Sequence, residues 1–208
     1  MAGELTRAQL LGGGAKGGAA LLLGGAASGL LASRAQADPP ATSLGTVPAS
    51  DLAYVRLLIA VELLTVDFYT HAIASEHLRP QPLAEAQIAF INENEHYDYL
   101  AAAIASGGEV ALTAADVDFA YPQGGFYTAA AVIELASTLE HLALGAYLGA
   151  AGNLADPVLQ AAVAQITANE AQHLAAFAQR SRRPPFRQAF PDPLTIEEAS
   201  DALDAYTS

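Results

Sequence analysis

The 208-residue sequence contains no cysteine, no tryptophan and a single lysine, Lys16. Without cysteine, the chain has no disulfide framework, zinc ribbon, iron–sulfur cluster or thiol nucleophile. This absence does not fix the redox compartment, because a well-packed domain can be secreted without disulfides. The length predicts one domain with a substantial buried core.

Positive charge is also scarce, and the formal net charge is −13 at pH 7. From Asp38 onward the chain has 21 acidic side chains and six arginines. Such a surface repels phosphate backbones, so we expect no nucleic-acid partner. It attracts cations, which suits a metal-binding protein but does not prove one.

Residues 1–37 have the order of a secretory signal peptide. A charged start with Arg7 and Lys16 leads into an Ala/Leu/Gly-rich stretch, which ends in the cleavage-site pattern Ala35-Gln36-Ala37. This predicts an exported protein, whether periplasmic, cell-wall associated or extracellular. The apolar run is short and broken by glycine, so we expect no stable membrane span after cleavage. The export route (general secretory or twin-arginine) and cleavage itself stay open, and a disordered Gly/Ala tail is the alternative.

Four amphipathic helices follow a Pro/Ser/Thr-rich linker at 38–49. Apolar residues recur at core-facing helical spacing over about 50–78, 84–106, 126–151 and 157–181. Ser50 or Asp51 is the expected N-cap of the first helix. We expect residues 79–82 (Arg-Pro-Gln-Pro) to turn the chain before the second helix. Asp156-Pro157 is expected to open the fourth helix as its cap and first residue.

The long connection at 109–125 is explained if it crosses the full length of a bundle. Two short hairpin connections flanking one long crossover predict an all-α four-helix bundle over residues 50–181. We expect antiparallel packing within each hairpin and parallel neighbours across the crossover. Residues 182–208 are predicted to form a Pro-rich tail. Its short C-terminal helix, opened by a capping box at Thr195–Glu198, is expected to dock on the outside of the bundle.

Each of the four predicted helices carries a glutamate within its apolar stripe. The step Glu-x-x-His occurs twice, and a lone glutamate precedes each step by about 30 residues, so the two helix pairs repeat at an offset of 77 to 78 residues. Residues i and i+3 share a helix face, which lets the carboxylate and imidazole of one step reach one metal ion. The repeat matches the ligand pattern of dimetal carboxylate bundles. The predicted metal ligands are Glu62, Glu93, His96, Glu140, Glu170 and His173.

Charge neutralisation supports this assignment. Four ionised carboxylates buried in an apolar core are strongly unfavourable unless they are paired. Two divalent cations would balance them, with two neutral imidazoles completing the shell. We expect Glu93 and Glu170 to bridge the metals, and Glu62 and Glu140 to be terminal ligands. Oxygen-rich ligation with two nitrogens favours iron first and manganese second over zinc or copper.

A tyrosine follows each lone glutamate by seven residues. Tyr69 follows Glu62, and Tyr147 follows Glu140. Seven residues make two helical turns, so each phenol lies on the face of its glutamate, roughly 10 Å along the axis. Tyr69 and Tyr147 are candidate catalytic residues, either by hydrogen-bonding a bridging carboxylate across the bundle or as redox-active side chains. Simple core filling is the alternative.

The ligand pattern resembles the ferritin-like superfamily, in which bacterioferritin and rubrerythrin share two lone glutamates and two Glu-x-x-His steps. The leader, the crossover sequence at 118–126 and the tail sequence at 190–195 are more similar to exported ferritin-like proteins related to plant and bacterial desiccation proteins. The chain departs from rubrerythrins because it has no cysteine-containing rubredoxin module. Its Pro-rich tail differs from the docking helix of a cage-forming ferritin.

This resemblance implies more than one function. The first is an oxidoreductase in which the metal pair reacts with O₂ or H₂O₂, with ferroxidase, oxidase or catalase-like turnover. The second is a non-enzymatic, desiccation-related stress protein whose metals hold the bundle together. Iron storage is a third. The choice between Fe and Mn, the electron donor and the oligomeric state stay open, and a homo-oligomer is compatible with the sequence.

Overall fold

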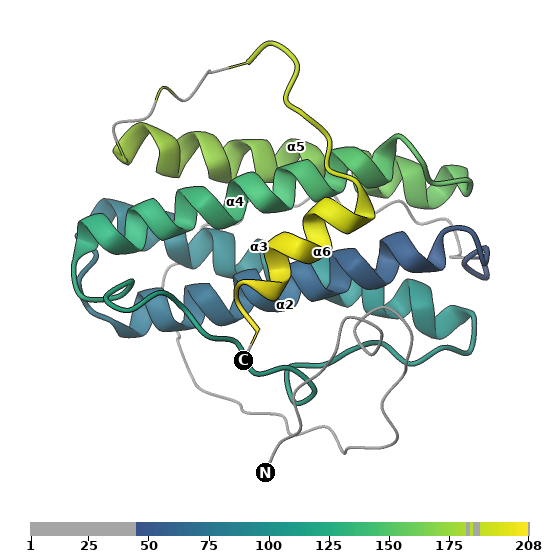
Figure 1. The fold of residues 1–208 in the computed structure, drawn as a ribbon, viewed down its shortest axis with the longest axis horizontal. Coiled ribbons are helices and arrows are strands. Elements are labelled where there is room, and N and C mark those ends of the chain that lie inside the picture. The colour runs from purple at the N-terminus through teal and green to yellow at the C-terminus, as the bar shows by residue number, and fades with distance from the viewer. Residues whose placement is uncertain (1–44, 182–183, 185–187, 208) are drawn as a thin grey trace, which may run out of the picture.

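The computed structural model describes residues 45–181, 184 and 188–207. Within these ranges it is all-α, as predicted, and its only β pairing is an isolated bridge between Phe119 and Thr207. The proposed signal peptide lies outside the described residues. The described helices are α2 (Leu52–Ala74), α3 (Pro80–Ser106), α4 (Ala129–Ala151), α5 (Pro157–Arg180) and α6 (Ile196–Asp204) (Figure 1).

Helices α2 to α5 form the predicted four-helix bundle. α2 packs on α3 and α4 packs on α5, and the two pairs meet through α2 with α4 and α3 with α5. Asp51 at the start of α2 accepts a backbone N–H bond from Ala155, after the end of α4. Arg180 at the end of α5 pairs with Glu85 near the start of α3. All these neighbours are therefore antiparallel, and the prediction of parallel neighbours was wrong. α3 and α4 run in the same direction, but they are not among the principal packed pairs.

The long crossover runs the length of α2, as the sequence predicted. Near one end of the bundle, Arg56 of α2 forms an ion pair with Glu109 at 2.7 Å. Further along, the Tyr121 hydroxyl donates to Oδ2 of Asp67 at 2.8 Å. The crossover, which connects α3 to α4 in the chain, therefore packs along α2.

Two helix starts differ from the prediction. α3 begins at Pro80 instead of at about residue 84, because Pro80 and Pro82 occupy the first turn, where a missing N–H breaks no helical hydrogen bond. α4 begins at Ala129, after Thr128 caps it by accepting the N–H of Ala131. The Asp51 side chain makes no cap bond with α2.

The tail docks on the bundle as expected. Thr195 forms the predicted capping box, and α6 packs on α2 and α4 (yellow in Figure 1). The preceding residue, Leu194, donates its N–H to the carbonyl of Gly145 at 2.9 Å. A Cβ on Gly149 would lie 1.9 Å from the Leu194 carbonyl oxygen. Two glycines one turn apart on α4, Gly145 and Gly149, thus allow the tail to pack closely against this helix.

Helices α2 and α4 form most of the apolar interior. Both are long and apolar enough to cross a membrane by length and composition, yet 67% and 61% of their most apolar stretches are buried inside the bundle. The carboxylates of Glu62 and Glu140 lie within the apolar faces of these helices and do not reach solvent, since both residues are fully buried.

Candidate metal centre

All six predicted ligand residues meet inside the bundle, one from each of α2 and α4 and two from each of α3 and α5. They form two overlapping groups, and the ligand atoms of each group lie within 4.8 Å of one another. Glu93 and Glu170 belong to both groups, which is the bridging position predicted for them. We name the groups by their histidines. The His96 group is Glu62, Glu93, His96 and Glu170, and the His173 group is Glu93, Glu140, Glu170 and His173.

The helical sequence explains why these side chains point inward. In α3 and α5, the Glu-x-x-His step places both side chains on the buried face. The four glutamates have no solvent exposure, and His173 is 7% exposed. The side chain of His96 is 11% exposed. The centre is therefore almost completely shielded from bulk solvent.

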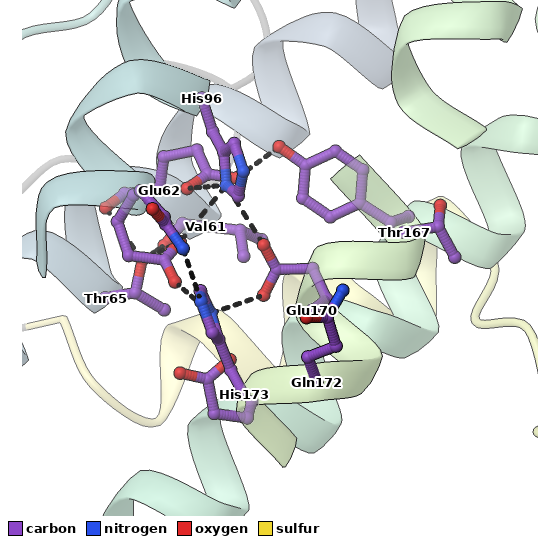
Figure 2. Close-up of polar contacts among 12 residues, drawn as sticks. Val61, Glu62, Thr65, His96, Thr167, Glu170, Gln172 and His173 are labelled. Atoms are coloured by element: carbon purple, nitrogen blue, oxygen red, sulfur yellow. Dashed lines mark hydrogen bonds and ion pairs between the residues drawn. The ribbon is translucent and has the colours of Figure 1, made fainter. Parts of the chain in front are cut away.

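The His96 group has close contacts between its imidazole and three carboxylates. Nδ1 of His96 lies 3.1 Å from Oε1 of Glu170, 3.6 Å from Oε2 of Glu93 and 3.7 Å from Oε2 of Glu62. Figure 2 shows the His96 ring on one side of the Glu170 carboxylate and the His173 ring on the other. Glu170 thus spans the space between the two imidazoles.

The His173 group repeats the arrangement. Nδ1 of His173 lies 2.9 Å from Oε1 of Glu93, 3.7 Å from Oε2 of Glu140 and 3.9 Å from Oε2 of Glu170. The two oxygens of Glu93 therefore face different histidines. Glu170 divides its two oxygens in the same way, so each bridging residue offers one oxygen to each group.

Nearly every inward-facing oxygen or nitrogen atom that could bind a metal in this centre lacks a hydrogen-bond partner. A buried polar atom without a partner costs about 1–3 kcal/mol. Seven such atoms in one volume fit a pair of cations, since carboxylate oxygens and imidazole nitrogens are metal ligands. The seven are Oε2 of Glu62, Oε1 of Glu93, Nδ1 of His96, Oε2 of Glu140, both carboxylate oxygens of Glu170 and Nδ1 of His173.

Comparison with protein families is consistent with this geometry. The family model described as "Ferritin-like domain" matches residues 50–182, well over half of the chain. The chain belongs to the ferritin-like family. The matched range holds α2 to α5 and all six ligand residues of this ferritin-like domain, so the predicted superfamily is confirmed. No curated protein matches the chain.

Without metal, protons neutralise part of the carboxylate charge in the ferritin-like centre. Burial, with the adjacent charge on Glu93, raises the pKa of Glu62 from 4.5 to about 8. Burial and Glu93 also raise the pKa of Glu170 well above its ordinary value. Burial alone would raise the pKa of Glu93, but the adjacent imidazoles of His173 and His96 outweigh it and lower that pKa. Glu93 is thus the carboxylate most readily ionised among these three.

The neighbouring glutamates favour the protonated form of both histidines. Burial alone would lower the pKa of each imidazole. The adjacent carboxylates of Glu170 and Glu62 outweigh burial and raise the pKa of His96. The adjacent charge of Glu140 does the same for the pKa of His173. A cation entering the centre would therefore compete with protons for Nδ1 and for the carboxylates.

Each tyrosine reaches across the bundle, but to a different carboxylate than predicted. The Tyr69 hydroxyl donates to Oε1 of Glu140, and the Tyr147 hydroxyl donates to Oε1 of Glu62. Their partners are therefore the lone glutamates, not the shared Glu93 and Glu170. The antiparallel packing of α2 and α4 places each phenol beside the lone glutamate of the other helix. Burial, reinforced by these carboxylates, raises the pKa of both phenols well above 10.

Two polar contacts in the centre were not predicted from the sequence. The Asn92 amide nitrogen lies 3.0 Å from Nε2 of His173, the ring nitrogen that does not face the carboxylates. The Thr65 hydroxyl donates to Oε2 of Glu93 at 3.3 Å. One signal was present, because both repeats read Asn-Glu-x-x-His, with Asn92 and Asn169 in front of the glutamates.

Proposed function

We propose that this ferritin-like chain is an exported dimetal-carboxylate protein that binds two Fe or Mn ions and reacts with O₂ or H₂O₂ in a ferroxidase or oxidase-like manner. The observation that carries the proposal is the set of seven buried, inward-facing donor atoms without hydrogen-bond partners. Two divalent cations would supply both the missing partners and the charge that makes four buried glutamates tolerable.

The ligands divide between two metal positions. The His96 group would hold one ion and the His173 group the other, with Glu93 and Glu170 contributing to both. Four carboxylates and two neutral imidazoles balance two divalent ions. When bound, a reduced Fe or Mn pair supplies the electrons for reduction of O₂ or peroxide.

The remaining groups exclude water and position the ligands. Tyr69 occupies Oε1 of Glu140 and leaves Oε2 facing the centre, and Tyr147 does the same for Glu62. Both phenols keep their protons at neutral pH because their pKa values are raised. Each phenol therefore holds a proton within hydrogen-bonding distance of a ligand carboxylate, which supports a catalytic role in reducing an oxygen substrate.

The sequence supports export and limits the partners. The order of charged, apolar and Ala-x-Ala segments in residues 1–37 supports secretion. The charge of −13 supports small-molecule substrates and cations over nucleic acid. The alternative function is a non-enzymatic, desiccation-related protein whose metals stabilise the bundle, and the near-complete burial of the centre favours it.

The test is rapid mixing of anaerobically Fe(II)-loaded protein with O₂ or H₂O₂, following oxidant consumption and the Fe(III) absorbance. The proposed function predicts several turnovers per centre. In Glu93→Ala, which removes a shared ligand, the reaction should fall to the rate of free Fe(II). If metal raises the melting temperature but no turnover appears, the structural alternative is correct. Iron storage requires a hollow cage, so a monomer or dimer on a sizing column excludes it.

A further inference from the structure

We infer that the two metal positions are inequivalent, and that the His173 position fills first and holds its ion more tightly. This inference rests on the dimetal site proposed above. It comes from the polar contacts around the ligands, which differ between the two halves of the repeat although the six ligand residues themselves are matched.

The first difference lies in the donor atoms. In the His173 group, none of the four inward-facing atoms has a hydrogen-bond partner outside the ligand set, so only the protons of the ligands themselves compete with a cation. In the His96 group, Oε2 of Glu93 lies 3.3 Å from the Thr65 hydroxyl, which shares its one proton between this oxygen and the backbone carbonyl of Glu62 at 3.0 Å. An ion at the His96 position would have to share this oxygen with the Thr65 hydroxyl, whose hydrogen carries a partial positive charge.

The internal repeat shows that this contact is specific to one half. Thr65 lies three residues after Glu62, and the residue three after Glu140 is Ala143. Alanine has no hydroxyl, so the corresponding contact cannot form in the other half. The Thr65 bond to Glu93 is therefore an asymmetric feature of the centre.

The second difference lies in the contacts of the histidine Nε2 atoms, which do not face the carboxylates. The Asn92 amide lies 3.0 Å from Nε2 of His173 and thereby fixes the orientation of that ring. When Nδ1 binds an ion, Nε2 carries a proton, and a half-turn of the amide brings its oxygen into position to accept it. Such a partner orients a ligand histidine and raises its basicity, and losing it costs about 10–100-fold in metal affinity.

The matched residue makes no such contact with the other histidine. Asn169 precedes Glu170 as Asn92 precedes Glu93, yet among the described residues no hydrogen bond joins Asn169 to the His96 ring. The His96 ring therefore lacks the support that holds His173. Both differences favour the His173 position.

The test is titration of metal-free protein with Mn(II), counting free Mn(II) by its six-line EPR signal. Wild type should bind two ions in two resolved steps. Asn92→Ala should weaken the tight step about 10–100-fold and leave the weak step nearly unchanged, whereas Asn169→Ala should change neither. Asn92→Asp, which keeps an acceptor for Nε2–H, should retain the tight step. His96→Ala should keep the tight step, and His173→Ala should abolish it.

The outcomes separate this inference from the proposed function. Wild type that binds no Mn(II) contradicts the dimetal site itself. Two ions bound with equal affinity, or a tight step that survives in His173→Ala, would overturn the inequivalence alone. An Asn92→Ala variant that weakens both steps by the same factor would show a general structural role and would also overturn it. Circular dichroism of each metal-free variant verifies that it is folded.

Discussion

At the scale of single residues, the centre depends on how buried carboxylates are neutralised. Glu62 and Glu170 have raised pKa values because they are buried next to the charge of Glu93. His96 and His173 have raised pKa values because glutamates surround them. Protons occupy this network in the metal-free protein, and metal ligands must lose them.

Metal binding should therefore release protons. Adding Mn(II) to metal-free protein in weakly buffered solution at pH 7 should acidify the solution, because Glu62, Glu170 and the two histidines give up protons as they bind. A pH-indicator dye measures the release, and a variant without Glu93 and Glu170 is the control. No acidification while two ions bind would contradict the protonation described for the metal-free centre.

The tyrosines make a separate contribution. Tyr69→Phe removes the donor to Oε1 of Glu140 and leaves a buried carboxylate oxygen without a partner, so the metal-free protein should lose about 1–3 kcal/mol of unfolding free energy. Tyr147→Phe should behave alike through Glu62. Urea denaturation measures the loss. Tyr127→Phe, at a residue that is 71% exposed, should change little, and an equal loss there would refute the specific role of the two buried phenols.

The six ligands could be predicted from the sequence because i,i+3 spacing and an internal repeat are local properties. The partners of Tyr69 and Tyr147 could not be predicted correctly, since they depend on how α2 and α4 are packed against each other. The contact between Asn92 and His173 also joins two helices, and side chains 81 residues apart meet there. Spacing within one helix carries no information about that pairing.

At the scale of elements, single polar and glycine residues hold the helices and tail together. Asp51 is fully buried and accepts the N–H groups of Ala155 and Asp156, so it joins the start of α2 to the α4–α5 turn. Burial would raise the pKa of Asp51. The hydrogen bonds from Asp156, Ala155 and the Ser50 hydroxyl outweigh burial and lower that pKa below 3.8.

Asp51→Ala should reduce the unfolding free energy by about 1–3 kcal/mol, because two buried N–H groups lose their acceptor. A lowered carboxyl pKa contributes stability that is fully present above pH 3.8 and is lost as the pH falls through the lower, folded-state pKa. The difference between wild type and Asp51→Ala should therefore shrink below pH 3.8. Urea unfolding at several pH values measures it, with the exposed Asp98→Ala as control. A difference that grows with acid would contradict this account.

The close packing of the tail on α4 predicts a second effect on stability. Gly149→Ala places a Cβ 1.9 Å from the Leu194 carbonyl oxygen, so the tail or α4 must move, at a cost of about 1–3 kcal/mol. Gly152→Ala meets nothing closer than 3.7 Å and should be nearly neutral. Thermal unfolding compares the two variants, and proteolysis should release the α6 segment faster in Gly149→Ala. Equal stability of both variants would contradict close packing at Leu194.

Helix existence and capping were predictable, whereas packing partners were not. The capping box at Thr195 and the cap at Asp156 rest on short-range patterns, and both are present in the structure. The start of α3 was placed late because its two prolines were treated as a turn, although prolines are also well suited to a first turn. The contact between Leu194 and Gly145 joins residues almost 50 positions apart, so spacing within one helix could not predict it.

At the scale of the whole molecule, the acidic residues are separated by burial. Among the described residues, only Asp51 and the four glutamates of the centre are buried, and the other acidic side chains are partly or fully exposed. The crossover and α6 cover α2 from outside. Because the ligand side chains are buried inside the bundle, a bound ion would be shielded from bulk water. The fold thus provides a closed, ligand-rich compartment for cations.

Metal stoichiometry tests this account most directly. Metal-free protein is incubated with Mn(II), or anaerobically with Fe(II), passed through a desalting column and analysed by inductively coupled plasma mass spectrometry. The account predicts two ions per wild-type chain and almost none in a Glu93→Ala/Glu170→Ala variant that lacks both shared ligands. Wild type that retains no metal, or a double variant that retains as much as wild type, would contradict it.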